Sequence, residues 1–184
     1  MLKNRLLYFV GPSGAGKDTL INCLRETPSL SSKIFFVKRQ VDRPIHNSSA
    51  LDVYLSPEGF AKALEHNELA MYWQANNHQY GILASDLSDA TQLPVAIING
   101  SRAYATKLEQ SFPGARVVLI TADQSMIEKR LLDRNRENSV QIQSRLERSR
   151  LLEDHDHFYA KVILNNSSIN HALKILLDYI EFDH

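Results

Sequence analysis

Residues 11–19 read GPSGAGKDT and combine closely spaced glycines with a lysine, a pattern suited to binding phosphate groups. Glycines let backbone amides surround an anion, and the Lys17 ammonium group can reach its outer oxygens. The apolar residues 6–10 predict a buried strand, and residues 19–24 have the apolar spacing of a helix. A strand, a glycine-rich turn and a helix in this order form a phosphate-binding loop. We therefore predict a nucleoside triphosphate site at Gly11, Pro12, Ser13, Gly14, Ala15, Gly16, Lys17, Asp18 and Thr19.

Asp18 stands where such loops usually carry a serine or threonine that binds Mg²⁺ through its hydroxyl group. A carboxylate is also a suitable oxygen ligand for Mg²⁺, either directly or through a water molecule. Thr19 could supply a hydroxyl group instead, although it lies one residue out of register. We predict that Asp18 binds Mg²⁺ when ATP is present.

A run of cations follows later in the chain, where residues 129–150 hold seven basic and only three acidic side chains. Basic residues at helical spacing are usually just a solvated face. Beside a phosphate-binding loop, however, arginines can clamp the oxygens of a transferring phosphoryl group. We predict an arginine-bearing lid over residues 134–148 that closes over ATP. The candidate catalytic residues are Lys17, Arg134, Arg136 and Arg145, with Arg130 as a further ATP-binding residue and Arg148 at the substrate.

Arg39 and Arg43 follow a second predicted strand at residues 33–37, at the end of the sheet where ligands bind in such folds. They could bind a second, phosphate-bearing substrate, or they could be ordinary arginines of a polar surface loop that runs from residue 38 to about residue 51.

The elements that must position these residues alternate between apolar strands and amphipathic helices. Further buried strands are expected at residues 95–99, 115–120 and 162–164, and further helices at 101–111, after Asp123 and at 169–180. Five apolar strands with helical crossovers imply a parallel sheet covered by helices on both faces. We predict an α/β P-loop fold in one domain, residues 1–184, whose core comprises residues 1–39 and 93–184.

The middle region, about residues 40–92, interrupts this alternation with a small mixed α/β pattern of its own. Ser56 and Pro57 predict the start of a helix that carries Phe60, Ala63 and Leu64 on one face. Residues 69–75 predict a strand and residues 76–78 a turn. We expect this insertion to bind the acceptor.

The overall composition, 43% hydrophobic and 23% charged, is that of a globular protein. Lys and Arg number 21 and are balanced by 21 Asp and Glu, which disfavours nucleic acid or a membrane surface as a partner. No apolar run is long enough to cross a bilayer, and the N-terminus lacks a signal-peptide pattern. We expect a cytoplasmic protein, either a monomer or a homodimer.

The chain resembles the guanylate-kinase-like branch of the nucleoside monophosphate kinases, and more closely the ribose 1,5-bisphosphate phosphokinases of bacterial phosphonate breakdown. The matching segments are the loop ending in Gly-Lys-Asp, Trp73-Gln74-Ala75-Asn76 with Tyr80-Gly81, Asn99-Gly100-Ser101-Arg102, and Arg134-Asn135-Arg136-Glu137-Asn138 with Arg145-Leu146. The resemblance implies that the γ-phosphoryl group of ATP passes to the C1 phosphate of ribose 1,5-bisphosphate, giving 5-phosphoribosyl 1-diphosphate. The substrate-binding residues that it implies are Arg39, Arg43, Tyr80, Asn99, Ser101, Arg102 and Arg148.

The acceptor implied by this resemblance is a phosphate, whose second pKa of about 6 leaves it largely ionised at neutral pH. No general base is then needed, and positioning by Lys17, Mg²⁺ and the arginines carries the reaction. Guanylate kinases have Ser or Gly in place of Asp18 and an aspartate near Asn99. We hypothesise that the two exchanges compensate each other, so that the charge near Mg²⁺ stays similar.

Two departures bear on the substrate. Residues 69–75 lack the glutamate with which guanylate kinases read guanine, and Ala50-Leu51-Asp52 differs from the acidic-polar-His group usual in the bisphosphokinases. The alternatives are a nucleoside monophosphate kinase with a different base preference and a non-catalytic domain that binds a protein partner. Retention of Lys17 and of the arginines favours an enzyme.

Overall fold

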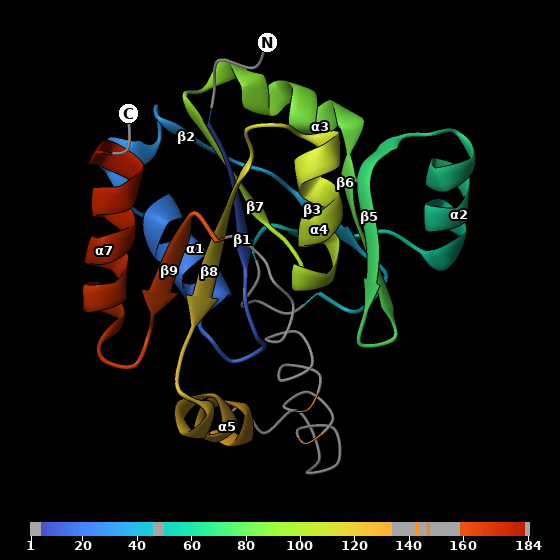
Figure 1. Cartoon of the computed structure of the whole chain (residues 1–184). Coiled ribbons are helices and arrows are strands. Elements are labelled where there is room, and N and C mark those ends of the chain that lie inside the picture. The colour runs from blue at the N-terminus through green and yellow to red at the C-terminus, as the bar shows by residue number, and fades with distance from the viewer. Residues whose placement is uncertain (1–4, 46–49, 134–142, 144–146, 148–158, 183–184) are drawn as a thin grey trace.

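Five short strands form a parallel sheet in the computed structural model, which describes residues 5–45, 50–133, 143, 147 and 159–182 (Figure 1). The strand order is β2-β7-β1-β8-β9, so β1 lies in the middle with β7 and β8 on either side. This confirms the predicted α/β fold with a five-stranded parallel core. The strands are β1 (Arg5–Val10), β2 (Ile34–Phe36), β7 (Val95–Asn99), β8 (Arg116–Thr121) and β9 (Lys161–Leu164).

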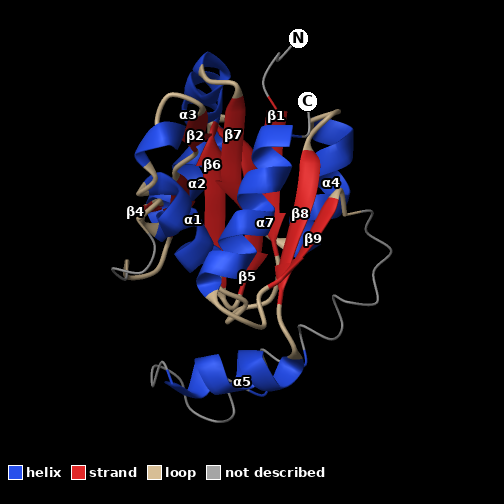
Figure 2. Cartoon of the chain, turned by 90° about the vertical axis from the view of Figure 1, so that its left-hand side faces the viewer, coloured by secondary structure: helices blue, strands red, loops and turns tan. Residues whose placement is uncertain are grey.

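Helices cover both faces of this sheet. Neighbouring residues of each strand point to opposite faces, so a strand can contribute apolar side chains to both layers of helices. Leu7 and Phe9 of β1 pack in one cluster with α1 (Lys17–Arg25) and α7 (Ile169–Phe182). Tyr8 and Val10 pack in a second cluster with α4 (Arg102–Ser111). Figure 1 shows α7 and α4 on opposite sides of β1 and β8, and Figure 2 shows α7 and α1 in front of the sheet. This arrangement buries the strands on both faces.

A second, four-stranded sheet packs on the α4 side and is ordered β4-β3-β6-β5. β3 pairs in parallel with β4 and antiparallel with β6, which also pairs with β5. Asn76 and Asn77 connect β5 to β6 with φ angles of 52° and 61°, as a two-residue hairpin turn requires. The strands are β3 (Arg39–Val41), β4 (Asp52–Tyr54), β5 (Leu69–Ala75) and β6 (His78–Leu83), and short α3 (Ala84–Asp89) follows β6.

The helix α2 (Pro57–Glu65) begins where the sequence predicts, and the Ser56 hydroxyl accepts a hydrogen bond from the Gly59 amide. Of the expected apolar face, Phe60 and Ala63 are buried, whereas Leu64 is 40% exposed. The helix lies at the outer edge of the second sheet (Figure 1), and the Phe60 ring packs against Tyr72 of β5 with 6.3 Å between the ring centroids.

The prediction of a continuous polar loop over residues 38–51 is also wrong in part, because β3 lies inside it. The three residues of β3, Arg39–Val41, are of mixed polarity and show no strand pattern of their own. They form a strand because β4 and β6 pair with them on both sides. Arg39, expected in a loop, is consequently buried.

After β8 the chain forms α5 (Gln124–Asp133), which projects beyond the end of the main sheet (Figure 2). Its Ile127 and Leu131 pack with Ala122 in a small separate cluster. Of the proposed lid at residues 134–148, only Gln143 and Glu147 lie within the described residues. In the parts of the chain that the structure describes, no helix is long and apolar enough to cross a bilayer.

Candidate active site

The glycine-rich loop connects the end of β1 to the start of α1 at the carboxyl edge of the sheet. Gly11 and Gly16 have φ angles of 146° and 93°, in the region that favours glycine. A Cβ atom at Gly11 would collide with the carbonyl of Ile120, and one at Gly16 with the side-chain amide of Asn165. The loop therefore packs closely against the ends of β8 and β9, which fixes its shape.

Lys17 is the first residue of α1, and its ammonium group lies back over the loop. Lys17 Nζ donates to the carbonyl oxygens of Gly11 at 2.8 Å and Pro12 at 3.1 Å. Gly16 occupies the N-cap position and has no side chain to satisfy the first amides of the helix. Those amides, the positive end of the helix dipole and Lys17 together suit the binding of a phosphate chain.

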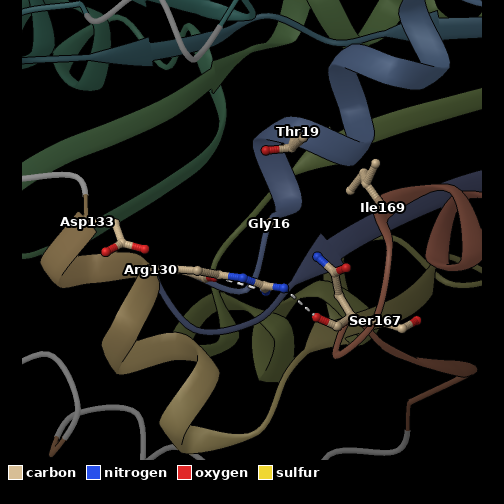
Figure 3. A pocket seen from close by; sticks show the side chains of 8 residues that line it. Gly16, Thr19, Arg130, Asp133, Ser167 and Ile169 are labelled. Carbon is tan, nitrogen blue, oxygen red and sulfur yellow. Dashed lines mark hydrogen bonds between the residues drawn. The ribbon is translucent and has the colours of Figure 1, made fainter.

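Beside the loop, a pocket of about 350 Å³ is lined by Gly14, Gly16, Thr19, Arg130, Asp133, Asn165, Ser167 and Ile169 (Figure 3). Arg130 extends from α5 and donates through Nη2 to the Asn165 carbonyl at 2.7 Å. The side chain of Asn165 in turn donates to the Ala15 carbonyl at 2.8 Å. These bonds join α5, the loop and the segment after β9. The pocket therefore offers a cation next to the phosphate-binding loop.

Sequence reasoning found Thr19 and Arg130 but missed the other side chains of this pocket. Asn165 directly follows β9, at the carboxyl end of a parallel strand, and that position was the available signal. Thr19 lines this pocket, whereas Asp18 takes part in a different contact.

Asp18 meets Asn99, the last residue of β7. Asn99 Nδ2 donates to Asp18 Oδ1 at 2.6 Å, which fixes the orientation of the amide because its oxygen cannot face a carboxylate. Asn99 is 3% exposed, and its Oδ1 is buried without a hydrogen-bond partner. Buried polar atoms are normally paired, so this oxygen is suited to a donor from a ligand. The two positions of the hypothesised exchange are thus in direct contact.

Arg39 and Arg43 converge on one carboxylate, that of Asp52 at the start of β4. Arg39 binds Asp52 Oδ1 through Nη2 at 2.7 Å and Nε at 2.9 Å, and Arg43 Nη2 binds Oδ2 at 3.0 Å. Arg39 also donates from Nη1 to the Asn99 carbonyl at 3.0 Å. Hydrogen bonds therefore lead from Asp18 through Asn99, Arg39 and Asp52 to Arg43.

The two arginines differ in exposure. The Arg39 side chain is 10% exposed and lies over the Tyr80 ring, with Cζ 5.3 Å from the ring centroid. Trp73 stacks on the same Tyr80 ring, with 5.8 Å between the two ring centroids. The Arg43 side chain is 22% exposed. Burial opposes the charge of Arg43, but Tyr80 and the carboxylates of Asp52 and Asp18 outweigh it and raise its pKa.

Arg102 is the first residue of α4, and Ser101 is its N-cap residue. The Ser101 amide donates to the hydroxyl group of Tyr8 at 2.9 Å, and burial raises the pKa of Tyr8 well above its ordinary value. Arg102 is 6% exposed. The remaining predicted site residues, Arg134, Arg136, Arg145 and Arg148, lie outside the described residues.

Comparisons with known proteins identify relatives along nearly the whole chain. A sequence profile of the family described as Guanylate kinase matches residues 3–183. The ribose 1,5-bisphosphate phosphokinase PhnN of Pseudomonas fluorescens (strain SBW25) is 32% identical, over 100% of this chain and 98% of that protein. The protein of the same name from Janthinobacterium sp. (strain Marseille) is 32% identical over 96% of this chain, which spans only 39% of that longer protein.

Among solved structures, guanylate kinase from Anaplasma phagocytophilum has the same fold. Its TM-score is 0.74, over 98% of this chain and 86% of that one, at 16% sequence identity. The structural similarity shows only that the two proteins share a fold. The sequence identity to the phosphokinases identifies the family within that fold. The chain belongs to the guanylate kinase family and, within it, to the family of ribose 1,5-bisphosphate phosphokinases called PhnN.

Proposed function

We propose that this protein is a kinase that transfers the γ-phosphoryl group of ATP to the C1 phosphate of ribose 1,5-bisphosphate. The products are ADP and 5-phosphoribosyl 1-diphosphate. The observation that carries the proposal is the series of hydrogen bonds and ion pairs that runs from Asp18 of the phosphate-binding loop through Asn99, Arg39 and Asp52 to Arg43. It joins a site suited to a triphosphate with a second cationic site suited to a phosphate acceptor.

On the donor side, the loop amides and Lys17 hold the β- and γ-phosphates of ATP, and the pocket beside Arg130 receives the rest of the nucleotide. The Asp18 carboxylate suits Mg²⁺ directly or through water, and the unpaired Oδ1 of Asn99 can accept a hydrogen bond from a water molecule bound to the ion. No group of three His, Cys, Asp or Glu side chains able to hold a metal occurs among the described residues. Mg²⁺ in such kinases takes most of its ligands from phosphates and water and needs only one or two carboxylates of the protein. When bound, the ion neutralises developing charge on the phosphates.

On the acceptor side, the Arg43 side chain is more exposed than that of Arg39, and Tyr80 lies beside it. Ser101 and Arg102, at the start of α4, complete the acceptor region in this proposal. An oxygen of the acceptor phosphate bonds to the γ-phosphorus, and the bond from that phosphorus to the bridging oxygen of ADP breaks. Because the acceptor is already ionised near neutral pH, no side chain has to remove a proton. Positioning and positive charge therefore supply the catalysis.

The finer organisation forms part of the same proposal. Residues 40–92 form the acceptor-binding part of a single domain, and residues 134–148 form a lid whose Arg134, Arg136 and Arg145 stabilise the transferring phosphoryl group, with Arg148 at the acceptor. We place the protein in the cytoplasm, as a monomer or homodimer, in phosphonate breakdown, as the family name of its relatives suggests.

The experiment that tests this function measures ADP release from ATP and Mg²⁺ with ribose 1,5-bisphosphate and, in parallel, with GMP, AMP, CMP and UMP. We expect turnover with the sugar bisphosphate only, and none with the Lys17→Ala variant. Turnover with a nucleotide but not with ribose 1,5-bisphosphate would show that the protein is a kinase and would refute the proposed acceptor. A lack of turnover with every acceptor, in protein that binds Mg·ATP, would support the alternative of a non-catalytic domain.

A further inference from the structure

Asp52 is a buried carboxylate that the phosphoryl-transfer chemistry does not itself require. Its side chain is 1% exposed, and each of its oxygens binds a different arginine. A buried charge is costly unless it is paired, and here one negative charge faces two positive ones. The cluster of Arg39, Asp52 and Arg43 therefore has a net charge of +1.

The two arginines of this cluster have different amounts of free hydrogen-bonding capacity. Arg39 uses Nε, Nη1 and Nη2 on Asp52 and on the backbone of Asn99, and its side chain is buried between strands. Arg43 binds Asp52 through Nη2, has a side-chain hydrogen bond with Tyr80, and makes a long contact of 3.4 Å from Nη1 to the Pro44 carbonyl, while its side chain is more exposed than that of Arg39. Arg43 is thus the member of the cluster that can still bind a ligand.

Two physical effects make Asp52 important for that binding. A free arginine side chain loses much rotamer entropy when it binds a phosphate, and a guanidinium group already held in place loses less. The carboxylate also lies between two cations that would otherwise repel each other. Both effects keep the Arg43 guanidinium group within electrostatic reach of Asp18 in the phosphate-binding loop.

We propose that Asp52 is a positioning residue of the acceptor site, which holds Arg43 where it binds a phosphate monoester. The proposal rests on the proposed function only in requiring an acceptor that carries a phosphate group. Asp52 belongs to the segment Ala50-Leu51-Asp52, in which the sequence departs from the related phosphokinases. The proposal makes this residue part of the acceptor site in this chain.

A double-mutant cycle tests this role, with Asp52→Asn, Arg43→Gln and the variant that carries both changes. If Asp52 acts through Arg43, Asp52→Asn raises the KM for the acceptor by about tenfold, as expected for weakening one charge-assisted hydrogen bond. The KM for ATP stays within about twofold, and the double variant is no worse than Arg43→Gln alone. Additive effects, or an equal rise in both KM values, would overturn the proposal.

The matched control is Asp42→Asn, which makes the same chemical change directly after β3, where Asp42 pairs with His78 of β6 at 3.1 Å. We expect it to leave both KM values unchanged. Asp52→Asn also leaves Arg39 without its counterion, so it can fail to fold; Asp52→Glu then replaces it, because it keeps the charge and displaces the oxygen that holds Arg43. Acceptor KM unchanged in Asp52→Glu, with folding confirmed by circular dichroism, would contradict the positioning role.

A binding measurement separates this inference from the proposed function. Ribose 5-phosphate is titrated into wild-type protein and into the variants by calorimetry without ATP. Weaker binding in Asp52→Asn and Arg43→Gln, but not in Asp42→Asn, supports the positioning role even if the true acceptor is a nucleotide. Binding that is equal in all four proteins overturns it, whatever the acceptor specificity of the kinase.

Discussion

The contact between Asn99 and Asp18 can be tested by exchanging which of the two positions carries the charge. Asn99→Asp places two carboxylates where a donor and an acceptor are now 2.6 Å apart. At an effective dielectric constant of about 20, two unit charges at that distance repel by about 6 kcal/mol. The pair can instead take up a proton. Because an aspartate in an unfolded chain has a pKa of about 3.9, holding that proton at pH 7 costs about 4 kcal/mol, which sets the upper limit of the destabilisation.

The pH dependence has a definite sign. Between about pH 4 and 7 the folded Asn99→Asp variant holds one more proton than its unfolded chain, so its free energy of unfolding falls as pH rises. Relative to wild type, the loss grows by about 1.4 kcal/mol per pH unit. Asp18→Ser removes one charge-assisted hydrogen bond, costs about 1.5–3 kcal/mol and gives no such slope.

The measurement is urea unfolding of the ligand-free protein at pH 5, 6 and 7, together with turnover at saturating ATP and Mg²⁺. In the variant with both changes, the introduced serine hydroxyl can donate to the introduced carboxylate, so the repulsion is absent. We expect this variant to exceed Asn99→Asp in both stability and turnover. If it is no better than the worse single variant, the two positions do not compensate each other. If Asn99→Asp keeps wild-type stability at every pH, the contact itself is refuted.

Three further predictions address the other parts of the site. Lys17→Ala should lower turnover by at least about 10²–10³-fold with an unchanged circular dichroism spectrum, because a donor to the phosphates is lost; a loss below about tenfold would contradict its role. Arg130→Ala should raise the KM for ATP by about tenfold and leave that for the acceptor unchanged, since Arg130 lines the pocket beside the loop; an equal rise in both would place it elsewhere. Tyr8→Phe should lower the free energy of unfolding by about 1–3 kcal/mol, because the Ser101 amide loses its acceptor. Since burial raises the pKa of Tyr8, absorbance titration of wild type minus this variant should show no phenolate at a pH of about 10, the ordinary tyrosine value.

The sequence predicts the parts of the fold whose determinants are local. The loop after β1 is recognisable because its glycines and lysine lie close together in the sequence. Residues 69–75 predict a strand because they are mainly apolar and aromatic and are followed by an Asn-Asn turn. Strand β3 was missed because Arg39–Val41 becomes a strand only by pairing with β4 and β6. Leu64 follows the helical spacing of Phe60 but is exposed, because spacing does not tell how wide the surface beneath a helix is.

The sequence predicts which types of residue make up the site, but it does not predict which of them contact each other. Arg39 and Arg43 are identifiable from their place after a strand, but their convergence on Asp52 depends on the parallel pairing of β3 and β4. That pairing also decides that Arg39 is buried while Arg43 keeps donors for a ligand. Asn165 was overlooked because a single asparagine after a strand carries no motif, although the packing of the loop depends on it.

Identification of the product tests the central claim most directly. Ribose 1,5-bisphosphate, ATP and Mg²⁺ are incubated with the protein, and the products are examined by phosphorus NMR. We predict that the C1 phosphate signal is replaced by the two coupled signals of a diphosphate, that the C5 phosphate signal persists, and that ADP forms in equal amount. An unconsumed sugar bisphosphate, with GMP phosphorylated under the same conditions, would contradict the account.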